Sequence, residues 1–196
     1  MAARGIDKTR SVSPSGYMAI IGAAVIAYLL ACASVAGPPD WTEQRAILQG
    51  TGDERFFYGV GFVANIGDPH RAAELAQERA RTNLYQLLRS YSHELVLEYQ
   101  REQDGRGSPV AQKHAEQLVR LIERVGMQHA ALSERWPPGL TEPAWALVRL
   151  RLRDLMGPIL WDKSLAQELR DFFSEYAAVV HQRMTLELDP NTWAQQ

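Results

Sequence analysis

The segment FFYGVGFVA at residues 56–64 decides the fold of this chain, together with the segment DPHRAAELAQERARTNLYQLL that follows it at residues 68–88. The first segment mixes aromatic and β-branched residues, which predicts a strand. Gly59 and Gly61 inside it mark a bulge or a place where another backbone comes close. A phosphate-binding loop is excluded, because the third glycine and the Lys-Ser/Thr pair of nucleotide motifs are missing.

The second segment predicts a helix that packs closely on this strand. Asp68 is a favourable N-cap residue, and the backbone of Pro69 already suits a first helical turn. Apolar residues then recur at helical spacing and form one buried stripe with polar residues between them. The stripe contains Ala72, Ala76, Ala80, Leu84 and Leu87. Its alanines indicate a close approach to a sheet.

Two more elements are expected after this helix. At residues 94–99 apolar and charged residues alternate, which predicts a half-buried strand. Ser108 and Pro109 repeat the cap-plus-proline start, and the helix they begin ends near Gly126.

The remaining residues complete a sheet with helices. Residues 127–136 read as extended, and the alternating segment 144–152 follows the break Pro137-Pro138-Gly139, which together predict an antiparallel hairpin. A last amphipathic helix is expected at residues 164–181. The order strand, helix, strand, helix, strand, strand, helix predicts an α+β domain with a small, mostly antiparallel sheet and helices packed on it.

Composition narrows the possible functions. The chain has 196 residues, 46% hydrophobic and 22% charged, which is typical of one globular domain. A formal net charge of -2 and scattered arginines argue against nucleic-acid binding. Cys32 is the single cysteine, so an intrachain disulfide and a cysteine-rich metal site are excluded.

The amino-terminal residues read as an export signal. A basic start with Arg4, Lys8 and Arg10 precedes an apolar run at residues 17–36, which contains Cys32. Within that run, Leu29-Leu30-Ala31-Cys32 resembles a bacterial lipobox. The resemblance implies cleavage before Cys32 and attachment of diacylglyceryl and N-acyl lipid to it. Several acyl chains together make a stable membrane anchor.

Two other fates of this segment stay open. Ser34-Val35-Ala36 also fits an ordinary small-x-small cleavage site, and the apolar run is long enough to stay in the inner membrane uncleaved. All three fates place the rest of the chain outside the cytoplasm. Cys32 is followed by Ala33 and Ser34 and not by aspartate. Lipoprotein sorting rules, by resemblance, then favour the outer membrane, where we expect the periplasmic face.

Four motifs together resemble the LPP20 family of small bacterial outer-membrane lipoproteins. They are Pro39-Asp40-Trp41 after the cysteine, Phe57-Tyr58-Gly59-Val60-Gly61, the alanine-striped helix from His70, and Trp145-Ala146-Leu147-Val148-Arg149-Leu150. The resemblance covers residues 41–152 and implies an α+β domain without known catalytic residues. Some relatives belong to flagellar outer-membrane rings or disks, which implies that a role in an assembly is open to this chain.

The expected organisation follows from these readings. Residues 1–31 form the signal peptide, and residues 32–40 form the lipidated cysteine and a tether. A single domain is expected at residues 41–182, with the helix at 164–181 lying beyond the family-like part, and a loose tail at 183–196.

Catalytic and metal-binding patterns are missing from the sequence. No Gly-x-Ser-x-Gly elbow occurs, and no histidine forms an i, i+4 pair or a His-Glu-x-x-His run with another. The histidines fall on different expected elements: His70, His93, His114, His129 and His181. We therefore expect a non-enzymatic protein without metal or cofactor. A periplasmic enzyme or small-ligand carrier on the same anchor is the alternative, which a deep pocket with convergent polar groups would favour.

The last expected strand carries the candidate contact residues. Trp145, Arg149 and Arg151 alternate along it, with Arg153 continuing the pattern, so they share one face. That face is either an ordinary solvated sheet surface or a contact surface for lipid headgroups, peptidoglycan or an acidic partner. Trp145 would face a partner if the surface is open, and would be a packing residue if the last helix covers it.

The function expected from the sequence is that of a lipid-anchored structural or adaptor component of an outer-membrane or periplasmic assembly. Its expected partners are the membrane, through the anchor on Cys32, and either envelope proteins or further copies of the chain.

Overall fold

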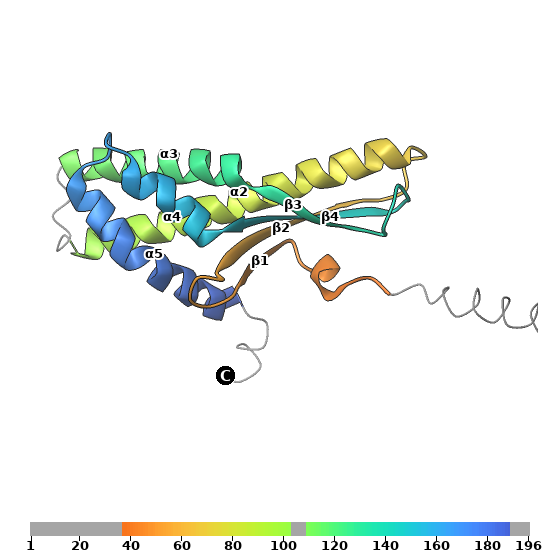
Figure 1. Ribbon diagram of the computed structural model, residues 1–196, viewed down its shortest axis with the longest axis horizontal. Coiled ribbons are helices and arrows are strands. Elements are labelled where there is room, and N and C mark those ends of the chain that lie inside the picture. Colours follow the sequence, from red (N-terminus) through yellow and green to blue (C-terminus); the bar gives the residue numbers. More distant parts are fainter. Residues whose placement is uncertain (1–36, 103–108, 189–196) are drawn as a thin grey trace, which may run out of the picture. The chain divides into compact units, whose positions relative to one another are not determined.

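The computed structural model describes residues 37–102 and 109–188 (Figure 1). Its described strands form one antiparallel sheet in the order β1-β2-β4-β3. The strands are β1 (Ala46–Gln49), β2 (Phe56–Val63), β3 (Ala131–Trp136) and β4 (Ala144–Arg151). The expected hairpin is confirmed, because β3 and β4 pair directly in antiparallel register.

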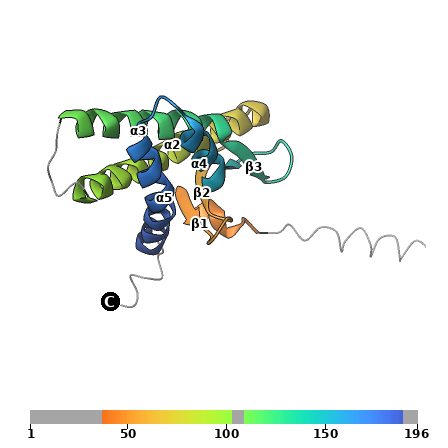
Figure 2. The same cartoon turned by 60° about the vertical axis from the view of Figure 1, so that its left-hand side comes forward.

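Helices supply the second layer. They are α2 (Pro69–Glu102), α3 (Pro109–His129), α4 (Leu152–Trp161) and α5 (Gln167–Leu188). A short 3₁₀ helix, η1 (Asp40–Glu43), precedes β1 and contacts β2 outside this layer. α2 packs along β2 and β4, α3 packs on α2 and α4, and α5 packs on α2, α4 and β1. Figures 1 and 2 show α2 and α3 side by side. The expected α+β class with an antiparallel sheet is confirmed.

The contact between β2 and α2 is unusually close because it is built from small residues. A Cβ atom added to Gly61 would lie 1.9 Å from the carbonyl oxygen of Ala76, and one added to Gly59 would lie 2.1 Å from that of Ala80. Ala76 and Ala80 are fully buried in the same contact. The close approach expected from the glycines and the alanine stripe is therefore confirmed.

The strand expected at residues 94–99 is wrong, because these residues continue α2. Leu95 and Tyr99 are both buried, and their spacing of four residues fits a helix as well as it fits a strand. No glycine or proline interrupts the chain between residues 69 and 102, so nothing in the sequence ends the helix at Ser90.

The ends of several expected elements also differ. The short strand β1 was not expected, and α4 replaces the end of the last strand, so that Arg153 lies on a helix. α4 forms across Gly157-Pro158 because Leu152, Leu155 and Ile159 recur at helical spacing and are buried. α5 begins and ends later than expected and extends to Leu188, so residues 183–188 are helical and not a tail.

Polar contacts fix α5 against α2. The guanidinium group of Arg183 donates to Glu98 at 2.7 Å and lies 3.6 Å from Glu94. The hydrogen bond from Arg183 lowers the pKa of the Glu98 carboxyl. Deeper in the core, the buried Tyr91 hydroxyl donates to the carbonyl oxygen of Ala177 at 2.9 Å. α2 therefore holds the last helix as well as the sheet.

His181 joins α5 to the start of β2. Its Nε2 atom lies 3.2 Å from the Phe56 carbonyl oxygen, and its ring meets the Phe57 ring edge-on at 4.9 Å between centroids. The side chain is fully buried, and burial lowers the pKa of the imidazole. A neutral ring that donates from Nε2 fits both neighbours, so His181 packs between α5 and the start of β2.

Gly61→Ala tests the glycine-alanine contact. The added methyl group meets backbone atoms of α2, which cannot move aside without shifting the whole helix, so we expect a loss of about 1–3 kcal/mol in the free energy of unfolding. Chemical denaturation followed by circular dichroism measures this loss. Gly157→Ala is the matched control, because no atom lies within 4 Å of its added methyl group. Equal stability of the two variants would contradict the proposed contact.

Candidate functional site

The side of the sheet that faces away from α2, here called the outer face, carries the candidate site. Side chains alternate along a strand, and Gly59 and Gly61 of β2 face α2. The residues of β2 that alternate with these glycines therefore point away from α2. The register of the four strands then places a single set of side chains on this face. The set contains Ile47, Gln49, Phe56, Tyr58, Val60, Phe62, Ala131, Glu134, Trp136, Trp145, Leu147, Arg149 and Arg151.

One end of the outer face is aromatic. The Trp145 ring lies 4.5 Å from that of Phe62 and 5.1 Å from that of Trp136, measured between centroids. These tilted and edge-on geometries are favourable for aromatic pairs. Phe62 is nevertheless 45% exposed, and both tryptophans are only half-buried. We call Phe62, Trp136 and Trp145 the aromatic end.

The other end of the outer face carries two arginines. The guanidinium carbons of Arg149 and Arg151 lie 5.8 Å and 5.1 Å from the centroid of the Phe56 ring, within range of a cation–π contact. Arg149 is exposed, and Arg151 lies 3.8 Å from the Glu54 carboxylate. We call Phe56, Arg149 and Arg151 the arginine end.

Tyr58 lies next to the arginine end and stays protonated. Burial raises the pKa of its phenol above the ordinary value, and the positive charge of Arg149 only partly opposes this. Its hydroxyl is therefore neutral at physiological pH and can donate a hydrogen bond.

Trp41 covers the centre of the outer face. Its ring packs on a small cluster formed by Ile47, Val60 and Leu147, which the sheet separates from the main core. Its Nε1 atom donates to the Glu134 carboxylate on β3 at 3.0 Å. The segment that enters the domain is thus fixed across the sheet, between the aromatic end and the arginine end.

The structure brings the candidate contact residues of β4 together as expected. Trp145, Arg149 and Arg151 share the outer face. The last helix packs on α2, α4 and β1, while Arg149 on β4 stays exposed. Trp145 is thus held by its aromatic neighbours and not by the last helix, and its contact with a partner stays a prediction.

The lipidation site cannot be compared with the structure. Cys32 and the residues Leu29, Leu30 and Ala31 before it lie outside the described residues.

Three residues of the outer face were not singled out from the sequence. Phe62 and Trp136 could have been found from alternation, because Phe62 shares parity with Tyr58 and pairs across the sheet with Trp145. Trp41 was part of the motif Pro39-Asp40-Trp41, but the sequence did not indicate that it lies on the outer face. Its place depends on a contact with Glu134, which is 93 residues away in the sequence.

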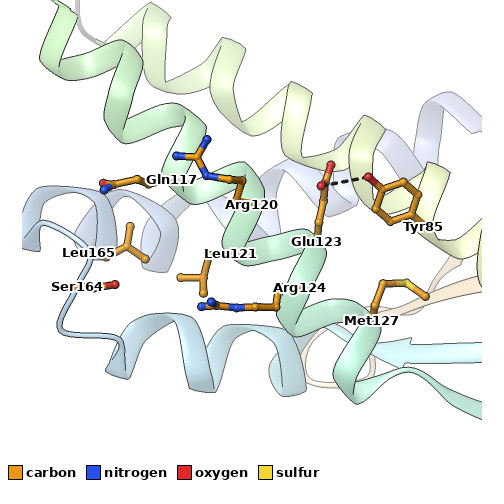
Figure 3. Close-up of a pocket in the computed structure, with 9 residues that line it drawn as sticks. All are labelled: Tyr85, Gln117, Arg120, Leu121, Glu123, Arg124, Met127, Ser164 and Leu165. Atoms are coloured by element: carbon orange, nitrogen blue, oxygen red, sulfur yellow. Dashed lines mark hydrogen bonds between the residues drawn. The ribbon is translucent and has the colours of Figure 1, made fainter.

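A groove along α3 is the other candidate region. It has a volume of about 620 Å³ and is lined by Tyr85, Gln117, Arg120, Leu121, Glu123, Arg124, Met127, Ser164 and Leu165 (Figure 3). Its charged groups do not converge: Glu123 accepts from the Tyr85 hydroxyl at 3.2 Å, and Arg124 lies 3.8 Å from Asp162. Figure 3 shows Arg120 and Arg124 pointing to different sides of the groove. This arrangement lacks the convergent polar groups of a catalytic pocket.

A second hollow, also of about 620 Å³, lies beside β2 where β1 no longer covers it. Here α2 supplies side chains to the strand edge. Asn83 donates to the Val60 carbonyl oxygen at 2.7 Å, and Arg79 donates to that of Phe62 at 2.6 Å. Because these acceptors are already bonded, this edge is a poor template for an added strand.

Neither a metal cluster nor a membrane-spanning helix occurs in residues 37–102 and 109–188. No group of three or more His, Cys, Asp or Glu side chains in these ranges is placed to hold a metal ion. None of the helices described there is both long and apolar enough to cross a bilayer.

Comparison with protein-family models, with curated proteins and with solved structures finds no match to this chain.

Trp41→Ala tests the closure of the outer face. Loss of the indole removes the cover over Val60 and the bond to Glu134, so we expect η1 to detach and trypsin to cut after Arg45 at least about tenfold faster. The rate is measured by mass spectrometry of the fragment that begins at Ala46. Trp161→Ala is the matched control, since Trp161 is 84% exposed. An unchanged rate in Trp41→Ala would show that Trp41 does not hold this segment.

Proposed function

We propose that this chain is a lipid-anchored, non-enzymatic protein of the bacterial envelope that serves as a structural or adaptor component of an outer-membrane or periplasmic assembly. The outer face of the sheet is its contact surface. The observation that carries the proposal is the exposure of Phe62 and Arg149 on a sheet face that carries aromatic rings at one end and arginines at the other.

The composition of the outer face supports binding. Tryptophan, tyrosine and arginine are the residues most enriched at the energetic centres of protein interfaces, and all three occur here on the three adjacent strands β2, β4 and β3. An ordinary solvated sheet face would carry mainly short polar and charged residues. The rigid sheet behind them holds the rings in fixed positions, which lowers the entropy lost on binding.

The titrating groups also favour binding over catalysis. His181 and Tyr91 are buried as packing residues. The groove along α3 holds its charged side chains in separate pairs. A small-ligand carrier that uses this groove is the second candidate, because Leu121, Met127 and Leu165 give it an apolar lining.

The export signal and the lipobox-like residues at 29–32 support the envelope location. The domain begins six residues after Cys32, at Pro38. Six residues span about 21 Å at full extension, so a lipid on Cys32 would keep the start of the domain close to the membrane surface. The outer membrane is the proposed location, with an uncleaved inner-membrane anchor as the alternative.

Intact-mass analysis of the membrane fraction tests the anchor. Expressed in a Gram-negative host, the wild-type chain is expected to begin at Cys32 and to carry the added mass of a diacylglyceryl group and an N-acyl chain. Cys32→Ala removes the acceptor sulfur, so that variant is expected to lack this mass and to keep its leader. Separation of the two membranes on a sucrose gradient gives the location.

Two results would contradict the anchor. A full-length, unlipidated chain that Cys32→Ala leaves unchanged would favour the inner-membrane alternative. A chain that begins at Gly37 without lipid would show ordinary secretion.

A further inference from the structure

The two ends of the outer face carry different kinds of side chain. The face is therefore complementary to a second copy of itself that is turned end to end. On β4, Trp145 lies at one end and Arg149 lies four residues further along, a separation of about 13 Å at the usual rise of a strand. β2 runs antiparallel beside it and repeats the pattern, with Phe62 next to Trp145 and Phe56 next to Arg151. Each face therefore has one end that carries aromatic rings and one end that carries guanidinium groups.

We propose that the outer face is the interface of a symmetric dimer of this chain. A two-fold axis that lies in the interface and runs across the strands, through the centre of the face, brings the arginine end of each copy onto the aromatic end of the other. This inference rests on the proposed function only in taking the outer face as a contact surface, and it does not depend on the lipid anchor.

The chemistry of the two ends fits this arrangement. Arginine is weakly hydrated and planar, so it stacks on aromatic rings more readily than lysine does. Arg149 and Arg151 already lie over the Phe56 ring, so each copy makes aromatic contacts of this kind within its own outer face. Each cation–π contact strengthens association by about two- to fivefold, and the two-fold axis makes every contact twice.

The charges around the arginines favour a second copy over an anionic partner. Glu54 lies 3.8 Å from Arg151, and the charges of Glu134 and Glu54 act on Tyr58 together with those of both arginines. The arginine end is therefore nearly balanced in charge and has little long-range attraction for an anionic membrane or nucleic acid. The same balance lets two copies approach without repulsion.

The edges of the sheet are less suitable than the outer face for binding a second copy. Asn83 and Arg79 occupy the open edge of β2, as described above. On the other side, the free strand β3 is irregular between Leu132 and Glu134, and an irregular, charged edge pairs poorly.

The size of the outer face sets the expected affinity. The strands β1, β2, β3 and β4 have 4, 8, 6 and 8 residues. At the usual rise and strand spacing they give a footprint of roughly 400 Å² per copy. That area is at the lower end of specific interfaces, where dimers are weak. We therefore expect a dissociation constant in the micromolar range, on the order of 1–100 μM.

A mixing experiment with two complementary variants tests the dimer. The variant Arg149→Ala/Arg151→Ala lacks the arginine end, and the variant Phe62→Ala/Trp145→Ala lacks the exposed part of the aromatic end. Full chains in detergent are compared by sedimentation velocity over a range of concentrations. Wild type is expected to dimerise, and each variant alone is expected to dissociate at least about tenfold more readily.

The association measured for the mixture of the two variants decides whether the arginine end meets the aromatic end. An equimolar mixture of the two variants retains one intact arginine-on-aromatic contact, whereas a homodimer of either variant retains none. The mixture is therefore expected to associate more tightly than either variant alone and more weakly than wild type. Arg120→Ala/Arg124→Ala on α3 is the matched control and is expected to dimerise like wild type. Circular dichroism verifies that every variant is folded.

Several outcomes would overturn the inference. A monomeric wild-type chain would do so, as would a dimer that both variants retain, since a surface other than the outer face would then hold it together. Folded variants that do not recover association on mixing would show that the arginine end does not meet the aromatic end. A lipidated monomer would leave the proposed anchor intact, and an unlipidated dimer would leave this inference intact.

Discussion

The close contact between β2 and α2 is the constraint on which the rest of the structure depends. Gly59 and Gly61 present bare backbone to the carbonyl groups of Ala80 and Ala76, so the helix lies directly on the strand. A long α2 fixed in this position covers β2 and β4 and extends past the sheet, where it carries α3 and α5. The helices thereby gather on one side, and the outer face is left to the sheet and to Trp41.

The outer face remains partly exposed because the helices α2 to α5 pack on the other side of the sheet. The inner side chains of the sheet join the main core, whereas Ile47, Val60 and Leu147 form a separate small cluster on the outer side. A cluster of this size needs a cover, and Trp41 supplies it at the centre. The rings and guanidinium groups on either side of Trp41 remain accessible, which makes the surface suitable for a partner of similar flatness.

Sequence patterns predicted the fold class, the β2–α2 contact and the shared face of Trp145 and Arg149, because all three follow from local periodicity. They were wrong at residues 94–99, where a spacing of four residues between Leu95 and Tyr99 satisfies both periods, and where the lack of a glycine or proline favoured a continuing helix. Trp41 was missed for a different reason, since its bond to Glu134 joins distant parts of the chain. Cys32 depends on processing and on residues that the described structure does not include.

The central claim is that the outer face, and not the groove along α3, is the surface through which this protein works. Photo-crosslinking in living cells tests it most directly, with a photoreactive amino acid in place of Phe62 on the outer face or in place of Gln117 in the groove. The account predicts protein adducts from position 62, with a second copy of the chain among them, and none from position 117. Adducts from position 117 alone would contradict it and would move the working surface to α3.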